Sequence, residues 1–220
     1  TDLEKMIANK KGDETLDLSG KSLNGLDLSG LHLQGAVLRA ARLNKATLRG
    51  AHLEGAALDA VWGLEADFSE AHLEGASLIG GQFVKAIFNR ANFSGAKVKS
   101  NFTNASLLKA CFEGADLSPG HKNQRAMVKR GFEGANLEGA SFRKANLLEA
   151  DFEYASLKDA DFFQAILVNA HLSGAILSGS NVNEADFNGA DLNSAKLEGI
   201  KNLERAKFFD KALNLDRAYR

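Results

Sequence analysis

Histidines recur in this sequence at a spacing that could bring them together as metal ligands. They fall 20 residues apart, each directly before a leucine, at His32, His52 and His72. Glu54 and Glu74 follow the second and third histidines by two residues, and the hexapeptide AHLEGA occurs intact at 51–56 and 71–76. Imidazole and carboxylate groups are typical ligands of Zn²⁺ and Cu²⁺. If residues 20 apart stack, these side chains form a metal site or, more simply, a solvent-exposed histidine stack with His–Glu pairing.

Large apolar residues at positions expected to face water could bind a protein partner. In one such group, Leu148 and Val168 lie 20 residues apart. Ile166 and Phe163 flank this pair. Leu108 and Val128 extend the same column if the spacing survives the segment between them. An apolar stripe on a polar surface is typical of a partner or dimer interface, although single exposed apolar residues are common. Trp62 stands beside Gly63, a position where the repeating pattern described below has glycine in place of a large apolar residue. Trp62 is therefore either an exposed anchor for a partner or a side chain that repairs the packing at Gly63.

The segment SPGHKNQRAMVKRG, residues 118–131, interrupts the pattern and is rich in basic residues. Its candidate recognition residues are Lys122, Arg125, Lys129 and Arg130. The segment is expected either to project as a basic loop or to form two degenerate repeat units with a bulge. Charged surface loops are usually solvated, but recognition residues are often found on loops.

Bulk composition excludes several classes of function. The net charge of −1 gives no general reason for direct nucleic-acid binding, and the single cysteine excludes an internal disulfide framework. No apolar run approaches the roughly 18–20 residues of a membrane span, and no leader opens the chain, which favours a cytoplasmic location and no membrane partner. No Ser–His–Asp grouping, nucleotide-binding loop or Cys/His metal spacing is present, so we expect no enzymatic activity and no cofactor.

The elements that position these residues follow a period of five. A large apolar residue, here called the centre, recurs at every fifth position from Leu18 to Val98, from Phe102 to Leu117 and from Phe132 to Leu197. Alanine usually stands two residues before the centre, and glycine often stands two residues after it. An α-helix turns about 100° per residue, so a period of five would scatter the centres around its circumference. In a strand, residues two apart share a face, so the alanine and the centre point inward together and the glycine marks a turn.

A turn after every five residues closes a four-sided coil in 20 residues. Successive coils then stack as short parallel strands about 4.8 Å apart, and the crossover rule favours a right-handed winding. Adjacent sides alternate in size, as in Phe132, Leu137, Phe142 and Leu147, so opposite sides match and fill a square shaft. The predicted fold is an all-β, right-handed quadrilateral parallel β-helix of about nine coils with short helical caps.

The phrases Ala135-Asn136-Leu137 and Ala190-Asp191-Leu192 resemble the A(D/N)LxX units of the pentapeptide repeat family. The resemblance covers about residues 16–199 and implies a right-handed quadrilateral β-helix. For function it implies less, because most members of the family have none assigned. Some members, the Qnr-type quinolone-resistance group, bind DNA gyrase by imitating duplex DNA, but they commonly have cysteine where this chain has alanine.

The expected organisation is a rod with two caps and an insertion. Residues 1–12 form an N-terminal cap with a helix over 2–10, and coils span 16–117 and 132–199 around the 118–131 segment. Residues 200–220 form a C-terminal cap, mostly helical over 202–218 because apolar residues there repeat at helical spacing. At Gly63, an unfilled centre would cost about 2–5 kcal/mol, which predicts a bulge or coverage of the gap by Trp62. Between Val98 and Phe102 one residue is missing, which should kink a corner.

These observations favour a rigid, non-enzymatic scaffold that binds an unidentified protein, with a homodimer possible through the C-terminal cap or the apolar stripe. One alternative is a DNA mimic that binds gyrase or topoisomerase, since residues 132–200 carry eleven acidic residues against four basic ones. Another alternative is a secreted bacterial effector, because some effectors contain such repeats.

Overall fold

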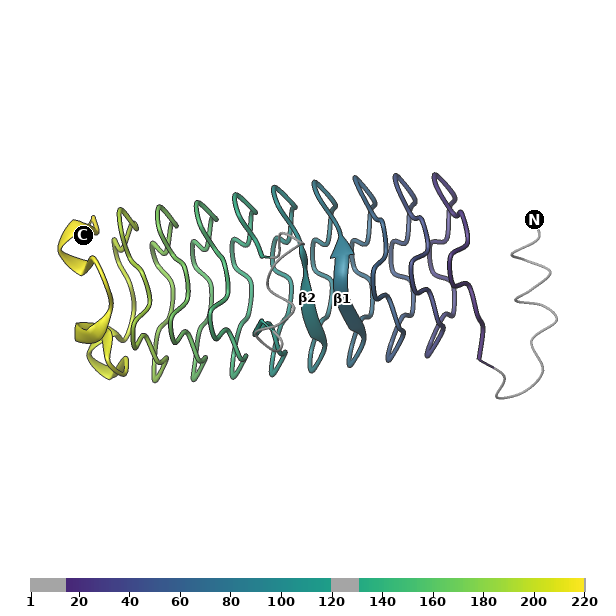
Figure 1. The fold of residues 1–220 in the computed structure, drawn as a ribbon. Helices are drawn as coiled ribbons and strands as arrows, with labels where there is room; N and C mark the ends of the chain where they lie inside the picture. Colours follow the sequence, from purple (N-terminus) through teal and green to yellow (C-terminus); the bar gives the residue numbers. More distant parts are fainter. Residues whose placement is uncertain (1–14, 120–130, 220) are drawn as a thin grey trace.

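The structure is a computed structural model that describes residues 15–119 and 131–219, which wind into a straight rod of stacked coils (Figure 1). Each side of a coil contributes one residue that forms parallel β-bridges to the coils before and after it, as His52 does with His32 and His72. Bridged residues lie 20 apart over most of the rod, so four five-residue sides complete one coil. The fold is thus a quadrilateral parallel β-helix. Within these two described ranges, no helix has the length and hydropathy needed to cross a membrane.

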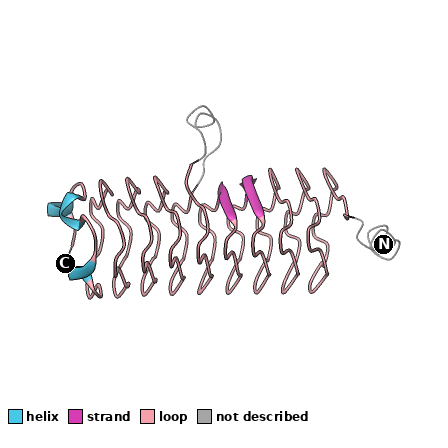
Figure 2. Ribbon diagram, turned by 90° about the horizontal axis from the view of Figure 1, so that it is seen from below, coloured by secondary structure: helices cyan, strands magenta, loops and turns pink. Residues whose placement is uncertain are grey.

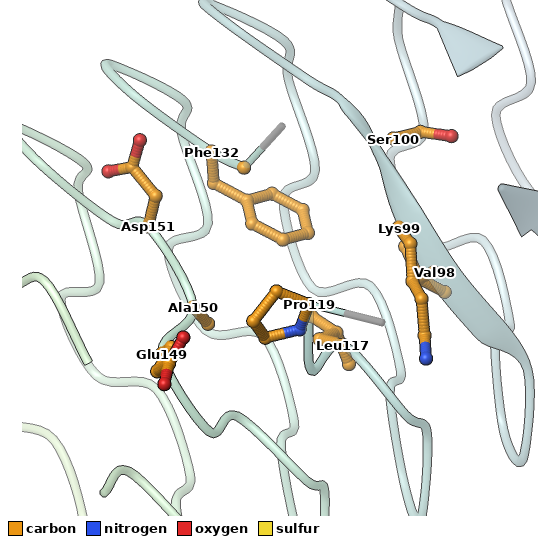
Figure 3. A pocket seen from close by; sticks show the side chains of 10 residues that line it. Val98, Lys99, Ser100, Leu117, Pro119, Phe132, Glu149, Ala150 and Asp151 are labelled. Atoms are coloured by element: carbon orange, nitrogen blue, oxygen red, sulfur yellow. The ribbon is translucent and has the colours of Figure 1, made fainter. Parts of the chain in front are cut away.

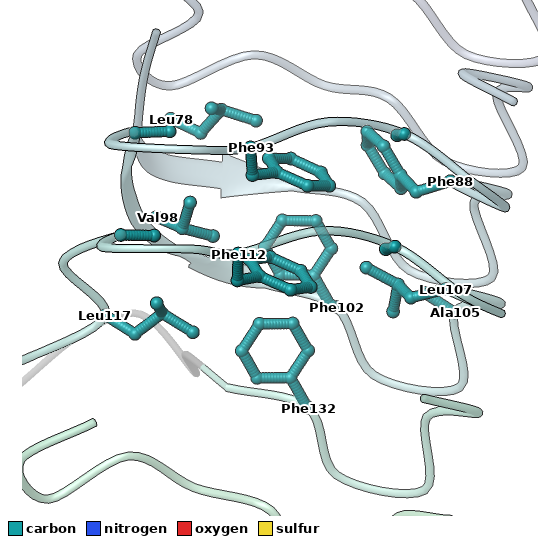
Figure 4. Packing of buried hydrophobic residues seen from close by; sticks show 14 of the residues in the cluster. Leu78, Phe88, Phe93, Val98, Phe102, Ala105, Leu107, Phe112, Leu117 and Phe132 are labelled. Carbon is teal, nitrogen blue, oxygen red and sulfur yellow. The ribbon is translucent and has the colours of Figure 1, made fainter. Parts of the chain in front are cut away.

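Two inward residues from each side fill the interior of the rod. The apolar centres from Leu18 to Leu197 are at most 7% exposed, and the alanines two residues before them are also buried. Phenylalanine rings stack from coil to coil, with centroids 4.6 Å apart for Phe93 and Phe112 (Figure 4). Parallel stacks of this kind leave no channel along the axis, so the shaft is packed as tightly as an ordinary protein core.

The Asp or Asn of the A(D/N)L phrase stabilises the corner that follows it. The Asp161 carboxylate accepts a hydrogen bond of 3.0 Å from the backbone N–H of Phe163, two residues further on. Asn136 does the same for Glu138 at 3.1 Å. Such side chains mimic a backbone turn and therefore favour bending at that point. The residue after this bond takes a left-handed conformation, with φ of 67° at Gly139 and 55° at Gln164, so glycine is the low-energy choice there.

The 118–131 segment is an insertion between two consecutive sides of one coil. Bridges connect Asp116 with Asn146 and Asn101 with Gly131, in each case 30 residues apart instead of 20. Ten residues are therefore added while the register of the coils continues on both sides. Residues 120–130, including the four candidate recognition residues, lie outside the described residues: Lys122, Arg125, Lys129 and Arg130.

Where one residue is missing, the corner is replaced by extended strand. Strands β1 (Ser77–Gln82) and β2 (Lys97–Asn101) pair in parallel, with a bulge between Ile79 and Gln82 (Figure 2). Ser100 takes the inward place that alanine usually holds and is 2% exposed. Its hydroxyl donates to the Leu78 carbonyl and accepts a 2.8 Å bond from the Gly81 N–H. The Ser100 hydroxyl thereby provides hydrogen-bond partners for the Gly81 N–H and the Leu78 carbonyl, at the point where the register is irregular.

Ser100→Ala is expected to destabilise the protein by about 1–3 kcal/mol, because it leaves a buried N–H and a buried carbonyl without partners. Ser180 provides a matched control, since it occupies the same inward place in another coil but its buried hydroxyl has no hydrogen-bond partner. Ser180→Ala should be neutral or stabilising for that reason. Urea denaturation of both variants measures the difference, and equal destabilisation by the two would contradict it.

Neither expectation for the gap at Gly63 is correct. Gly63 keeps the regular ladder, with its N–H 2.8 Å from the Gln82 carbonyl, so there is no bulge. Trp62 is 53% exposed and does not cover the gap. The ring of Phe83, from the next coil, fills it instead: a Cβ built on Gly63 would lie 2.7 Å from Phe83 Cδ1, and one built on Gly81 would lie 2.6 Å from Phe83 Cε2. Two glycines therefore make room for one phenylalanine.

The C-terminal segment is not the mostly helical cap predicted for 202–218. It contains three single 3₁₀ turns, η2 (Leu203–Arg205), η3 (Phe209–Lys211) and η4 (Leu215–Arg217), separated by bridges six residues apart. The sequence repeats in sixes here, as KNLERA, KFFDKA and LNLDRA, so each side of the last coil gains one residue and turns through a 3₁₀ corner. The predicted N-terminal cap, residues 1–12 with a helix over 2–10, lies outside the described residues.

Candidate functional site

Trp62 is a large aromatic residue exposed on one flat side of the rod. Its backbone is held in the ladder, with its N–H 3.0 Å from the Ala41 carbonyl, while 53% of the residue remains exposed. Arg42 and Gln82 bridge to it from the coils on either side, so the three side chains stand in one line. A large indole on a rigid backbone is the kind of residue that anchors a protein interface.

The surroundings of Trp62 are apolar and positively charged. Leu64 and Val84, half-buried, follow at the adjoining corner, and the exposed Lys85 comes next to Val84. Neither Arg42 nor Lys85 forms an ion pair with any residue that the structure describes. We call Arg42, Trp62, Leu64, Val84 and Lys85 the Trp62 surface.

Several neighbouring cations have a carboxylate partner among the described residues, unlike Arg42 and Lys85. The pairs, with their N–O distances of 3.5, 3.8 and 3.0 Å, are Arg39–Asp59, Lys45–Glu65 and Arg49–Asp67. Burial raises the pKa of the Asp67 carboxyl, but hydrogen bonds from Ser69 and Arg49 outweigh it and hold that pKa below its usual value. Arg42 and Lys85 therefore give the Trp62 surface positive charge that no ion pair with a described residue neutralises.

The predicted apolar stripe is smaller than its sequence indicated. Ile166 is 45% exposed, whereas Leu148, Phe163 and Val168 are half-buried. The Phe163 ring is covered by the Arg143 guanidinium, whose carbon lies 4.3 Å from the ring centroid. Part of the stripe thus has a partner already within the chain.

Leu108 does not belong to this stripe. Ser106 bridges to Asn136, and Asp116 bridges to Asn146, so Leu108 shares a column with Glu138, and Ser118 shares one with Leu148. Counting back in steps of 20 from Leu148 fails because of the ten-residue insertion. Val128, predicted in the same column, lies outside the described residues.

The three histidines form the predicted ladder on the side of the rod opposite Trp62. The rings of His32, His52 and His72 stack with centroids 4.7 and 4.8 Å apart and nearly parallel planes. His52 Nδ1 lies 3.2 Å from Glu54 Oε1, and His72 Nδ1 lies 3.6 Å from Glu74 Oε1. Burial raises the pKa of the Glu54 carboxyl, but hydrogen bonds from its own backbone N–H and from His52 outweigh this and lower it.

The described surface has several shallow hollows. One of about 60 Å³ lies where the insertion leaves the rod and is lined by Leu117, Pro119 and Phe132 (Figure 3). Lys99 reaches its rim and pairs with Asp116 at 2.9 Å. Another, of about 330 Å³, lies along a corner between Arg49 and Lys109. The first holds a few water molecules at most, since a water occupies about 30 Å³ in the liquid.

Comparison with protein families gives a match over most of the rod. The model of pentapeptide repeats matches in eight copies, over residues 17–58, 66–100, 98–118, 132–167 and 165–201. The chain belongs to the pentapeptide repeat family. Proteins of this family form right-handed β-helices, so the predicted handedness is that of the family. No curated protein matches the chain.

Solved pentapeptide repeat proteins resemble the chain to different extents. HetL, involved in heterocyst differentiation regulation in the cyanobacterium Nostoc sp. strain PCC 7120, is 29% identical with a TM-score of 0.67, over 99% of this chain and 92% of HetL. Rfr23 from the cyanobacterium Cyanothece 51142 is 34% identical with a TM-score of 0.31, over 46% of this chain and 60% of Rfr23. The plasmid-mediated fluoroquinolone resistance protein QnrB1 is 18% identical with a TM-score of 0.33, over 88% of both chains.

Sequence reasoning missed several exposed aromatic and aliphatic residues of this pentapeptide repeat protein. Tyr154 is 67% exposed at a corner, and at the C-terminal end the exposed residues are Leu203, Phe208, Leu213 and Tyr219. The six-residue repeat is the signal that could have found the last group. A helix would have placed Leu203, Phe209 and Leu213 on one buried face, whereas the six-residue sides leave Leu213 and Tyr219 at outward bridge positions.

Proposed function

We propose that this pentapeptide repeat protein is a non-enzymatic scaffold that binds a protein through the Trp62 surface. The observation that carries the proposal is Trp62 itself, 53% exposed in line with the unpaired Arg42. The partner that fits this chemistry is a protein segment with an apolar or aromatic side chain flanked by acidic residues. The indole supplies apolar contact area, and Arg42 and Lys85 supply the complementary charge.

A rigid support favours this use of the surface. Trp62 and its neighbours on the ladder are fixed by backbone hydrogen bonds to two coils, as in the 2.6 Å bond from the Leu43 N–H to the Trp62 carbonyl. Ordering of side chains and loops is a major cost of association, and a preformed β-helix side loses little entropy when a partner docks. The filled shaft supports a binding role over a catalytic one, because catalytic sites are usually concave and exclude water.

The similarity to HetL supports a regulatory context for such binding. HetL is described as involved in the regulation of differentiation, and the two folds agree over nearly the whole of both chains. We infer that this chain also acts by binding a regulatory or regulated protein.

The distribution of acidic residues supports this proposal over imitation of DNA. Within the described residues, no column of the rod holds three acidic residues in succession. Asp151 and Asp191 are separated by His171, and Glu138 is followed by Lys158 at 3.8 Å. A surface that imitates duplex DNA needs rows of negative charge, since DNA carries one about every 1.7 Å along its axis.

Affinity capture with purified variants tests the proposed surface. The wild-type protein, Trp62→Ala, Arg42→Glu and Tyr154→Ala are used to capture proteins from a lysate of the source organism, and the captured protein is then purified and titrated by calorimetry. Trp62→Ala should raise Kd at least about 30-fold, equivalent to about 2 kcal/mol, because an interface anchor of this size is lost. Arg42→Glu should also raise Kd, and the increase should be larger at low salt than at high salt, because salt screens the charge interaction.

Tyr154→Ala is the matched control, because it removes another exposed aromatic residue, 67% exposed against 53% for Trp62, from a different part of the rod. Its Kd should stay within about twofold of the wild-type value. A partner that binds the wild type and Trp62→Ala equally well would refute the surface. Light scattering distinguishes a second copy of the chain from another protein as the partner.

A further inference from the structure

Two copies of the motif His-Leu-Glu bring four potential metal ligands to one corner of the rod. His52 with Glu54 and His72 with Glu74 occupy equivalent positions in adjacent coils, because His52 and His72 are bridged. In each copy Nδ1 of the imidazole faces the carboxylate of the same side. The donor atoms of His52, Glu54 and His72 all lie within 4.8 Å of one another.

The carboxylates are not fully satisfied by the protein. Oε2 of Glu54 and Oε2 of Glu74 are both shielded from solvent and have no hydrogen-bond partner. The other oxygen of Glu74 accepts a 2.6 Å bond from the Asn92 amide. Shielding an ionised oxygen without a donor or a cation costs free energy, so an atom of this kind calls for a specific partner. Two such atoms in adjacent coils, beside two imidazoles, point to a shared cation.

We propose that His52, Glu54 and His72 bind one Zn²⁺ ion, with Glu74 or water as the fourth ligand. Two histidines and one glutamate are a known ligand set of zinc, whereas calcium and magnesium prefer oxygen ligands alone. The ion would lie between the two coils, on the side of the rod opposite the Trp62 surface. The proposal is therefore independent of the proposed protein-binding function.

The site requires movement of side chains only. In a tetrahedral zinc site with bonds of about 2.1 Å, ligand atoms lie about 3.4 Å apart, which is closer than the stacked rings allow at present. The side chains of His52 and His72 are 33% and 45% exposed, so both rings can tilt toward the ion. The backbone can stay in place, because it is fixed in the ladder by bonds such as the 2.9 Å bond from the His72 N–H to the Ala51 carbonyl.

The ladder contains its own comparison. His32 stacks on His52 in the same way, but Gln34 takes the place of the glutamate and lies 3.3 Å from His32 Nδ1. Since a neutral amide is a much poorer zinc ligand than a carboxylate, the ion should bind between His52 and His72 and not between His32 and His52. Beyond His72 the column continues with Asn92 and Cys111, which places the thiol two coils away.

Titration of the chelator-treated full chain with zinc chloride at pH 7.5 tests the site. Calorimetry should show one ion per chain with micromolar affinity, and histidine NMR signals should show the largest shifts at His52 and His72. Glu54→Gln, which keeps the shape of the side chain, should weaken binding at least tenfold, and His52→Asn should do the same. Zinc should raise the Tm of the wild type and leave that of Glu54→Gln unchanged.

Two control variants address other sources of binding. Cys111→Ser and His171→Asn remove the remaining cysteine and histidine side chains that the structure describes outside the ladder, and both should keep the wild-type affinity. The metal-free Tm of Glu54→Gln should match that of the wild type, which shows that the variant folds. The proposal is overturned if millimolar zinc leaves the His52 and His72 signals in place, if Cys111→Ser abolishes binding, or if Glu54→Gln binds as tightly as the wild type.

Discussion

Gly63→Leu is expected to destabilise the wild-type protein and to stabilise a variant that lacks the Phe83 ring. In the wild type, a Cβ at position 63 would lie 2.7 and 2.9 Å from two carbons of the Phe83 ring. That ring cannot move aside, because Phe68, Phe88 and Phe102 pack against it with centroids 5.3 to 5.8 Å away. The substitution should therefore cost about 1–3 kcal/mol through overpacking.

Phe83→Ala should have the larger effect, about 3–5 kcal/mol, because it empties a shaft in which Gly63 supplies no side chain. In that background, the leucine introduced by Gly63→Leu can occupy the space that the ring has left. The double variant should thus be more stable than Phe83→Ala alone, so the coupling energy should exceed the cost of about 1–3 kcal/mol that Gly63→Leu has in the wild type. Urea denaturation of the four proteins, with m-values compared to check that the unfolding transition is unchanged, completes the cycle.

Phe162 supplies the control for this cycle. It is fully buried and stacks on Phe142, coils away from the Phe83 and Phe68 rings that a Cβ at position 63 would meet. Gly63→Leu and Phe162→Ala should therefore be additive within about 0.5 kcal/mol. Additivity of Gly63→Leu with Phe83→Ala would mean that the ring does not fill the gap.

The sequence was sufficient to predict the rod because its period is a steric consequence of the fold. An alanine such as Ala145 and a centre such as Leu147 face one shaft, and the spacing allows no other regular structure. The sequence was not sufficient to predict the packing where a side chain missing from one coil is replaced by a side chain from another coil. The gap at Gly63 is filled by Phe83, and the signal for this was Gly81, a second glycine out of phase with the turns.

The predictions of a helical C-terminal segment and of Leu108 in the apolar column were wrong for a different reason. Local spacing in the sequence fits more than one structure. Within the six-residue sides, apolar residues happen to fall three, three and four residues apart, which is the spacing of one face of a helix and predicts a helical segment: Leu203, Ala206, Phe209 and Leu213. For the candidate site, the histidine column and Trp62 could be identified from spacing. The neutralisation of Arg39 by Asp59 and the lack of a pair for Arg42 depend on which corner each side chain occupies, which spacing alone does not specify.

Ala56→Leu is expected to lower the free energy of unfolding several-fold more than Ala57→Leu, although the two residues are adjacent in sequence. Ala56 faces the shaft and is fully buried, whereas Ala57 faces outward and is partly exposed. The coils on either side cannot separate to admit a larger side chain, since the Ala57 N–H bonds the Ala36 carbonyl and the Ser77 N–H bonds the Ala56 carbonyl, both at 2.9 Å. Ala56→Leu should therefore cost about 1–3 kcal/mol or more, and Ala57→Leu should stay within about 0.5 kcal/mol of the wild type. Urea midpoints that agree for the two variants would show that the shaft has room to spare, and alanine would then not be a steric requirement of the five-residue unit.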